Sequence, residues 1–250
     1  MHKKRYTVTG LSVEASYTSE EVTDIFQPLL QNLLTIRAEK GDRVIVYLAA
    51  PPGAGKTTLS LFLEDLYKEI DTPYTFQSVS MDGFHHYNHY LDSHMVNRNN
   101  QTELLRRFKG IPESFDVNLL KETIQKLQNQ KHVYWPTYDR LLHDVSDKKL
   151  KVEADIILIE GNYLLLDKPV WNKLKALSDY TIAIKTPLSE LEKRLIDRKQ
   201  KGGATLAEAK KHVKRTDKPN AELVLEHSQP ADYNLILNHG KYEKITPQNP

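Results

Sequence analysis

Residues 50–57 of the chain form a glycine-rich turn, Ala-Pro-Pro-Gly-Ala-Gly-Lys-Thr, between two segments of different periodicity. Before the turn, residues 43–49 are rich in β-branched side chains, which is typical of a buried parallel strand. After it, residues 56–70 carry large apolar side chains at helical spacing. A strand that passes through a tight turn directly into a helix predicts an α/β fold.

The composition of this turn indicates a phosphate-binding loop, although Ala50 stands where the pattern usually has its first glycine. Gly53 and Gly55 let the backbone turn tightly and approach an anion without a Cβ atom in the way. Successive N–H groups and the dipole of the following helix supply positive potential. Lys56 is placed to reach the β- and γ-phosphates of a nucleotide, and the Thr57 hydroxyl to join Mg²⁺. We predict that ATP binds at Pro52, Gly53, Ala54, Gly55, Lys56, Thr57 and Thr58.

Apolar patterns in the rest of the chain predict alternating strands and helices. Strands are expected at residues 75–81, 131–135, 154–160, 179–184 and 232–237, the last of which closes the sheet. Helices are expected at residues 19–39, 116–129, 187–200, 205–215 and 219–227. Gly41 is placed to end the first helix and Asp116 to cap the second. The pattern predicts a P-loop NTPase fold, with three layers α/β/α and a mostly parallel sheet.

The composition narrows the class of protein. The formal net charge of +2, from 35 basic and 33 acidic residues, is too balanced for a nucleic-acid or membrane-surface protein. The absence of cysteine excludes disulfides and fits a reducing cytoplasm. The N-terminus lacks the apolar core of a secretory signal, and no stretch approaches the ~18 apolar residues of a membrane span. We expect one soluble, cytoplasmic domain with no nucleic-acid or membrane partner.

Two carboxylates follow predicted strands. Glu160 ends the run 154–160, where an acid that serves Mg²⁺ lies beside the phosphate-binding strand. Asp82 follows the run 75–81, and a carboxylate there can accept the proton of an attacking hydroxyl, bind Mg²⁺, or do both. Gly83 is expected to leave room for a substrate beside Asp82. Taken alone, the first acid is also consistent with an ordinary strand end and the second with an Asp-Gly turn.

Six ordered elements resemble the phosphoribulokinase/uridine kinase family of P-loop kinases, which also includes bacterial pantothenate kinase. They are Asp82-Gly83-Phe84, Pro112-Glu113-Ser114-Phe115-Asp116, Pro136-Thr137-Tyr138-Asp139, Glu160-Gly161, Arg194-Leu195 with Arg198, and Ala231-Asp232. Residues 85–90 and the helix before the first strand are more similar to a bacterial branch of the family that contains sugar or nucleoside kinases.

The resemblance implies an enzyme that transfers the γ-phosphoryl group of ATP to a hydroxyl of a small metabolite. A sugar, a nucleoside and a pantothenate-like alcohol all fit. It implies Asp82 as the general base, with Thr57, Asp82 and Glu160 holding or surrounding Mg²⁺. The same comparison leaves a homodimer open.

The resemblance also divides the single domain of residues 1–250 into parts. Residues 1–42 would be an N-terminal helical extension, residues 84–140 would bind the acceptor, and residues 190–216 would form the lid. In this small helical lid, Arg194 and Arg198 are four residues apart, so they share a helix face. Together with Lys56 they would neutralise the negative charge of the γ-phosphoryl group as it is transferred. Asn220 is expected near the nucleotide base.

The segment 84–140 is rich in polar aromatic and basic residues, which suit a polyol or an anionic group on the acceptor. Its candidate contacts are His85, Tyr87, Arg98, Lys109, Tyr138 and Arg140. A zinc site formed by His85, His86 and His89 is disfavoured, because their spacing differs from His-Glu-x-x-His and no cysteine supports it.

Two other classes of nucleotide-binding protein share the glycine loop. A motor-type or AAA ATPase without a small-molecule acceptor is the main alternative, but the expected Mg²⁺ strand ends in Glu160-Gly161 and not in Asp-Glu. A GTP-dependent switch is disfavoured because the chain has no Asn-Lys-x-Asp for guanine.

Overall fold

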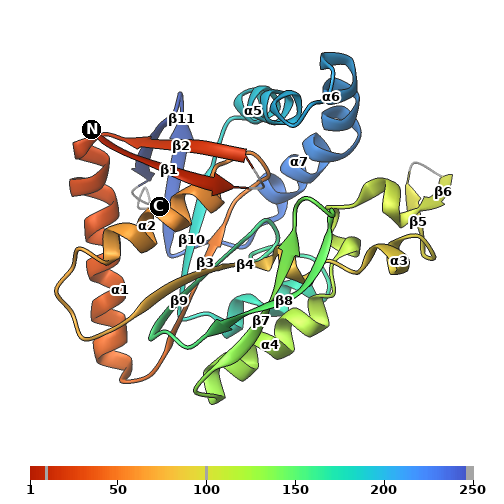
Figure 1. The fold of residues 1–250 in the computed structure, drawn as a ribbon. Helices are drawn as coiled ribbons and strands as arrows, with labels where there is room; N and C mark the ends of the chain where they lie inside the picture. The colour runs from red at the N-terminus through yellow and green to blue at the C-terminus, as the bar shows by residue number, and fades with distance from the viewer. Residues whose placement is uncertain (9–10, 99–100, 246–250) are drawn as a thin grey trace.

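The computed structural model describes residues 1–8, 11–98 and 101–245, and a six-stranded sheet lies at its centre (Figure 1). In spatial order its strands are β12 (Lys241–Ile245), β11 (Tyr233–Asn238), β10 (Tyr180–Lys185), β3 (Val44–Ala49), β9 (Ile156–Gly161) and β4 (Phe76–Ser80). At one edge β12 is antiparallel to β11, whereas every other pair of neighbours is parallel. The predicted α/β fold with a mostly parallel sheet is therefore confirmed.

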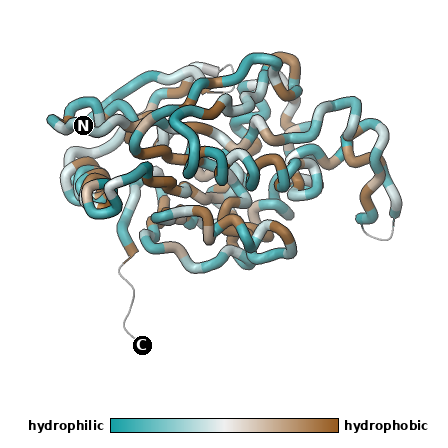
Figure 2. Tube along the Cα trace, turned by 90° about the horizontal axis from the view of Figure 1, so that it is seen from below, coloured by the Kyte–Doolittle hydropathy of each residue, from teal (hydrophilic) through white to brown (hydrophobic). Residues whose placement is uncertain are grey.

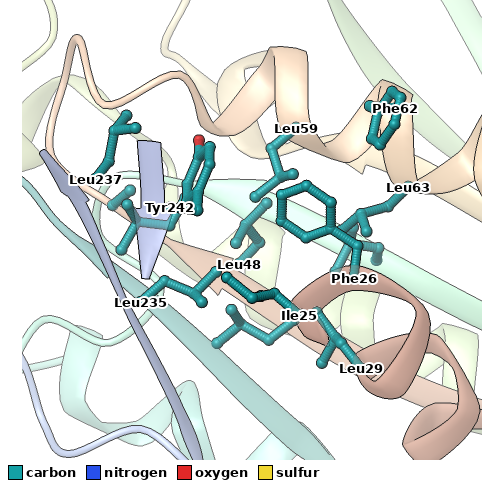
Figure 3. Close-up of a cluster of buried hydrophobic side chains, with 14 of the residues drawn as sticks. Ile25, Phe26, Leu29, Leu48, Leu59, Phe62, Leu63, Leu235, Leu237 and Tyr242 are labelled. Atoms are coloured by element: carbon teal, nitrogen blue, oxygen red, sulfur yellow. The ribbon is translucent and has the colours of Figure 1, made fainter. Parts of the chain in front are cut away.

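Helices cover both faces of this sheet. The helices are α1 (Gln27–Lys40), α2 (Lys56–Tyr67), α3 (Asn88–Leu91), α4 (Val117–Asn129), α5 (Leu188–Lys201), α6 (Leu206–His212) and α7 (Lys218–His227). Every residue of β3 is buried, and alternate residues point to opposite faces. Val44, Val46 and Leu48 pack with α1, α2 and α5, whereas Ile45 and Tyr47 belong to the cluster that contains α4. Figure 3 shows the first of these clusters.

Three antiparallel hairpins are added to the three layers. They are β1 (His2–Val8) with β2 (Leu11–Tyr17), β5 (Met95–Arg98) with β6 (Gln101–Leu104), and β7 (Val133–Asp139) with β8 (Asp144–Val152). The segment with α3, β5 and β6 projects from the body of the fold in both Figure 1 and Figure 2. In the described residues, no helix is both long enough and apolar enough to cross a bilayer.

The N-terminal extension differs from the expectation, because it is helical only in its second half. Ala15 and Tyr17 are buried at alternate positions of β2, which is the period of a strand. The Tyr17 ring packs 5.2 Å from that of Phe26, at the end of a π-helical segment that leads into α1. Gly41 then ends α1 with φ 71°, as its position predicted. Residues 2–8 and 11–17 are therefore two paired strands packed on the helices.

The last strand of the sheet also differs from the expectation, because β11 is followed by a further edge strand, β12. Two residues after β11 the chain turns back as β12, through His239 and Gly240, which both have positive φ. Tyr242 on β12 is buried against Phe26, with ring centroids 5.6 Å apart. This final strand was hidden in the sequence because it is short and three of its five residues, Lys241, Glu243 and Lys244, are charged and exposed.

Candidate active site

The glycine loop lies between β3 and α2 at the carboxyl end of the sheet (Figure 1). Gly53 and Gly55 have φ angles of 86° and 79°, a region that only glycine enters at low cost. Gly55 directly precedes α2, so the first amides of the helix, which lack partners within it, face the loop. Leu195 of α5 packs on Gly53, where an added Cβ would stand 3.0 Å from the Leu195 side chain. The loop thus has the shape of an anion cradle with α5 against it.

The Lys56 side chain is half-buried beside this cradle. Its burial, which is only partly offset by the nearby charge of Glu160, lowers the pKa of Lys56 to about 8. The positive charges of Arg198 and Arg140 lower this pKa further. Three cations therefore gather close enough to repel one another. A polyphosphate chain supplies the negative charge that such a cluster requires.

The two acids of the predicted Mg²⁺ site stand on neighbouring strands. Glu160 is the penultimate residue of β9, and Ser80, the last residue of β4, lies directly opposite it in the parallel register. The Thr57 hydroxyl donates to Glu160 Oε1 at 3.0 Å, and the Glu160 side chain is buried. Asp82 follows β4 in a 3₁₀ turn, Met81–Phe84. The fold thus brings the three predicted oxygen ligands to one edge of the sheet.

Glycines beside both acids allow these segments to approach closely. A Cβ atom on Gly161 would overlap the Met81 side chain, which precedes Asp82. A Cβ atom on Gly83 would overlap the Pro136 carbonyl of β7. The space left by the missing side chain of Gly83 is therefore filled by the backbone of β7, and not by a substrate as we expected.

Arg140, just after β7, forms an ion pair with the Asp82 carboxylate. We expected Arg140 to contact the acceptor, but the structure places it between the base candidate and the phosphate-binding cluster. Its guanidinium carbon also lies 4.7 Å from the centroid of the Tyr138 ring, and Lys109 Nζ lies 4.9 Å from the same centroid. Tyr138 therefore links the Asp82 carboxylate to the acceptor segment.

The half-buried His85 ring lies on the same side of the site, 5.1 Å from the Tyr138 ring. It packs against Phe115 with centroids 3.8 Å apart, and its Nδ1 lies 2.8 Å from the backbone oxygen of Asp82. Burial and the charge of Lys109 lower the pKa of His85 to about 3, so the imidazole is neutral at physiological pH. Because a carbonyl oxygen only accepts, Nδ1 carries the hydrogen. Nε2 is then an acceptor suited to a substrate hydroxyl.

Two predicted acceptor residues make their contacts elsewhere. Tyr87 is 45% exposed and stacks on His89 at 5.6 Å, while Arg98 on β5 donates to Glu113 at 3.1 Å. The imidazoles of the disfavoured zinc site also separate, because the His86 ring stacks on Tyr90 at 4.0 Å and that of His85 faces Asp82. Among the residues that the structure describes, no three His, Cys, Asp or Glu side chains are grouped so as to hold a metal ion.

The lid arginines lie on α5 but have different partners. Arg194 donates to Glu190, one turn earlier, at 2.5 and 3.0 Å. Arg198 is close enough to Lys56 and Arg140 to lower the pKa of both. Asn220, which we expected near the nucleotide base, is buried and donates to the backbone oxygen of Gly110 at 3.1 Å.

Comparison with known proteins agrees with this geometry. Residues 45–238 match the family model described as Phosphoribulokinase / Uridine kinase family. The chain belongs to the phosphoribulokinase/uridine kinase family. It is 41% identical to the uncharacterised Escherichia coli K12 protein YggC, over 96% of this chain and 98% of that one. It is 26% identical to a pantothenate kinase of Streptococcus pneumoniae serotype 19F, over 72% of this chain and 62% of the relative.

A solved crystal structure shares the fold. The crystal structure of a Silicibacter sp. TM1040 protein, which carries the provisional name fructose transport system kinase, superposes with a TM-score of 0.73. The two chains are 31% identical, and the match covers 82% of this chain and 97% of that one. The chain is therefore a P-loop kinase and a phosphotransferase of the phosphoribulokinase/uridine kinase type.

Sequence reasoning missed several residues of this kinase site. Thr7 and Val8 of the N-terminal hairpin line a cavity of about 240 Å³ together with Thr57, Asp82 and Glu160. Trp135 donates from Nε1 to the Ser80 oxygen at 2.8 Å and fixes β7 beside β4. No local sequence signal marks the hairpin as part of the site. Arg106, which donates to Asn88, was also missed, although it lies in a visible basic run, Arg106-Arg107-Phe108-Lys109.

Proposed function

We propose that this kinase transfers the γ-phosphoryl group of ATP to a hydroxyl of a small metabolite that occupies the cavity beside Asp82. One observation carries the proposal: the Asp82 carboxylate, held by Arg140, opens on the same cavity as Thr57 and Glu160. A carboxylate in that place is next to both a phosphate cradle and a space for an acceptor. An ATPase without an acceptor has no use for that space.

The proposed donor site is the glycine loop with Lys56. Backbone amides after Gly55 and the Lys56 ammonium group hold the β- and γ-phosphates. Arg198 and Arg140 extend the positive charge toward the bond that breaks, since both repel the Lys56 charge. As in phosphoryl transfer generally, positioning and electrostatic stabilisation then supply most of the rate.

The proposed base is Asp82. An acceptor hydroxyl gives its proton to the Asp82 carboxylate while its oxygen bonds to the γ-phosphorus, and the bond from that phosphorus to the bridging oxygen of ADP breaks. Arg140 favours the charged carboxylate, because it forms an ion pair with it. His85 Nε2 accepts a hydrogen bond from a second hydroxyl and so orients the acceptor.

The residues present fit a bound Mg²⁺. Thr57, Glu160 and Asp82 offer only oxygen donors, and the Thr57–Glu160 hydrogen bond of 3.0 Å places two of them side by side. When bound, Mg²⁺ neutralises charge on the β- and γ-phosphates. Glu160 is held there by its position on β9, buried beneath the loop.

The proposed lid is the segment 190–216, which includes α5 and α6. It contacts the glycine loop through Leu195, so movement of α5 changes access to the phosphates. Closure would exclude water and bring Arg198 to the transferred group. A cytoplasmic location and a homodimer stay predictions, and so do the roles of Arg194 and Asn220.

The proposal is tested by an acceptor screen. Purified protein with ATP and Mg²⁺ is offered sugars, nucleosides, pantothenate and related alcohols, and ADP release is measured. We expect acceptor-dependent release that falls at least ~100-fold in Asp82→Asn, the scale of general-base help. Asp147→Asn is the matched control, because Asp147 is an exposed residue of β8.

Two outcomes would contradict the proposal in different ways. Full activity of Asp82→Asn would remove Asp82 as the base while leaving the kinase in place. ADP release that no member of a broad panel stimulates would favour the ATPase alternative.

A further inference from the structure

Two basic side chains of the acceptor segment converge on one neutral oxygen. Lys109 Nζ donates to Asn88 Oδ1 at 2.7 Å, and the Arg106 guanidinium donates to the same oxygen. The other hydrogen bond of Lys109 goes to the backbone oxygen of His143 at 2.6 Å, which is also neutral. Two positive charges therefore share an amide oxygen that offsets neither of them.

Carboxylates lie nearby, but none of them neutralises this pair closely. Asp144 is 3.9 Å from Lys109, and Asp92 is 3.8 Å from Arg106. The Asp144 carboxylate already accepts from the backbone amides of Asn88 at 3.0 Å and Val145 at 2.9 Å. The Asp92 side chain is 57% exposed, so water screens its charge.

The surroundings of Lys109 make its charge costly, although Asp144 and Asp92 offset part of that cost. Its side chain is 15% exposed, and burial with the charge of Arg106 lowers the pKa of Lys109 to about 8. An anion in contact with both cations would reverse that shift, since an opposite charge favours the charged form. Arg106 and Lys109 both donate to the amide oxygen of Asn88, so an anionic oxygen in the same place could accept both hydrogen bonds.

The cationic pair stands one aromatic ring away from the reacting centre. Lys109 Nζ and the Arg140 guanidinium lie 4.9 and 4.7 Å from the centroid of the Tyr138 ring, and Arg140 is paired with Asp82. Tyr138 lines the cavity that Asp82 opens on, and Lys109 stands over the Tyr138 ring. An acceptor that extends from Asp82 past Tyr138 would therefore bring its far end to Lys109.

The loop that carries Lys109 is held in place from three sides. The backbone oxygen of Gly110 accepts from the Tyr163 hydroxyl at 2.7 Å and from Asn220 at 3.1 Å, and the Gly110 amide donates to Ser114 at 2.9 Å. These contacts tie the loop to α7 and to the segment after β9. The position of Lys109 is thus set before any ligand binds, which reduces the entropy cost of recognition.

We propose that Lys109 and Arg106 form an anion subsite, so that the phosphoryl acceptor is an alcohol that carries a phosphate or carboxylate group at the end remote from its reacting hydroxyl. This inference rests on the proposed function and names its substrate class. Ammonium and guanidinium groups bind both kinds of anion by charge-assisted hydrogen bonds. Neutral sugars and nucleosides leave the pair unsatisfied.

The test compares matched acceptors that differ in charge. ADP release with ATP and Mg²⁺ is measured for ribose against ribose 5-phosphate, glucose against gluconate, and glycerol against glycerate. We expect the anionic member of at least one pair to have the higher kcat/KM by about 10- to 100-fold, the value of a hydrogen bond to a charged group. Which pairs respond separates phosphate from carboxylate.

Variants then assign the preference to the subsite. Lys109→Gln and Arg106→Gln should each lower kcat/KM for the anionic member far more than for the neutral member, so that most of the preference for the anion is lost. Arg107→Gln is the matched control, because Arg107 is the neighbouring residue, 63% exposed and paired with Glu103 at 2.6 Å. It should keep the full preference. Calorimetric titration of ribose 5-phosphate and gluconate without nucleotide gives a readout that does not need turnover.

The outcomes separate this inference from the kinase proposal. Equal or better use of the neutral members, or a preference that survives both variants, overturns the anion subsite and leaves the kinase proposal intact. Anion binding that depends on Lys109, with no acceptor-stimulated ADP release, supports the subsite and contradicts the proposed kinase reaction. Absence of both overturns both.

Discussion

Replacing Gly83 by alanine adds one methyl group at the point where β7 crosses the turn that carries Asp82. An ideal Cβ at this position would stand about 1 Å inside the 3.0 Å that real Cβ atoms keep from other atoms, and the atom that it meets is the Pro136 carbonyl oxygen. The Thr137 amide nitrogen would be only 2.8 Å away. These are backbone atoms of a paired strand, so rotation of a side chain cannot relieve the overlap.

The magnitude follows from that shift. β7 must retreat by about 1 Å, and overpacking of this kind costs about 1–3 kcal/mol of folding free energy. In a domain of this size, that corresponds to a fall in melting temperature of roughly 2–12 °C. The retreat also carries Tyr138 and Arg140 away from Asp82, and a misplacement of about 1 Å lowers rates on the order of 100-fold.

The assay is acceptor-dependent ADP release combined with thermal unfolding. Gly41→Ala is the control, because Gly41 has φ 71°, ends α1 far from Asp82 and has no atom within 4 Å of an added Cβ. It should lower stability by about 1–2 kcal/mol through backbone strain alone and leave kcat unchanged. A Gly83→Ala variant with the melting temperature and kcat of the wild type would refute the reasoning, because β7 would then not be fixed against Asp82.

Three further predictions concern the nucleotide side and the lid. Because the pKa of Lys56 is lowered to about 8, its charge is present below that pH and lost above it, so the affinity for ATP measured by titration calorimetry should weaken as pH rises through 8. The same affinity at pH 9 and at pH 7 would contradict this. Arg198→Gln should lower kcat by at least ~10-fold more than Arg194→Gln, because Arg194 is already paired with Glu190 on its own helix. Equal losses of kcat would indicate that both arginines act on the transferred phosphoryl group. Asn220→Ala should raise the KM for the acceptor and not the KM for ATP, because the Asn220 amide holds Gly110, next to Lys109. A change in the KM for ATP alone would instead support the expected contact with the nucleotide base.

Much of the candidate site was predictable because its signals are local. A glycine turn between a strand and a helix needs only adjacent residues, and acids at strand ends can be located once the strands are known. The helix cap at Asp116 was predicted for the same reason, and its carboxylate accepts from the Leu119 amide at 2.9 Å. These features depend on backbone geometry within a few residues.

Pairings between distant segments were not predictable. Arg140 lies 58 residues from Asp82, and nothing near either residue marks the other as its partner. The N-terminal hairpin reaches the cavity because it packs on α2, where the Tyr17 ring lies 4.3 Å from that of Phe62 and the Tyr6 hydroxyl donates to Asp65 at 2.9 Å. Such contacts are decided by how complete elements pack.

The sequence by itself determined the phosphate-binding loop, the mostly parallel sheet and the family, because periodicity and motif order are properties of the chain. Only the tertiary structure decided that Gly83 makes room for β7, that Arg140 serves Asp82, and that Lys109 and Arg106 meet on Asn88. The physical reason is that close packing and charge pairing act between atoms brought together by the fold, at separations that no sequence spacing records.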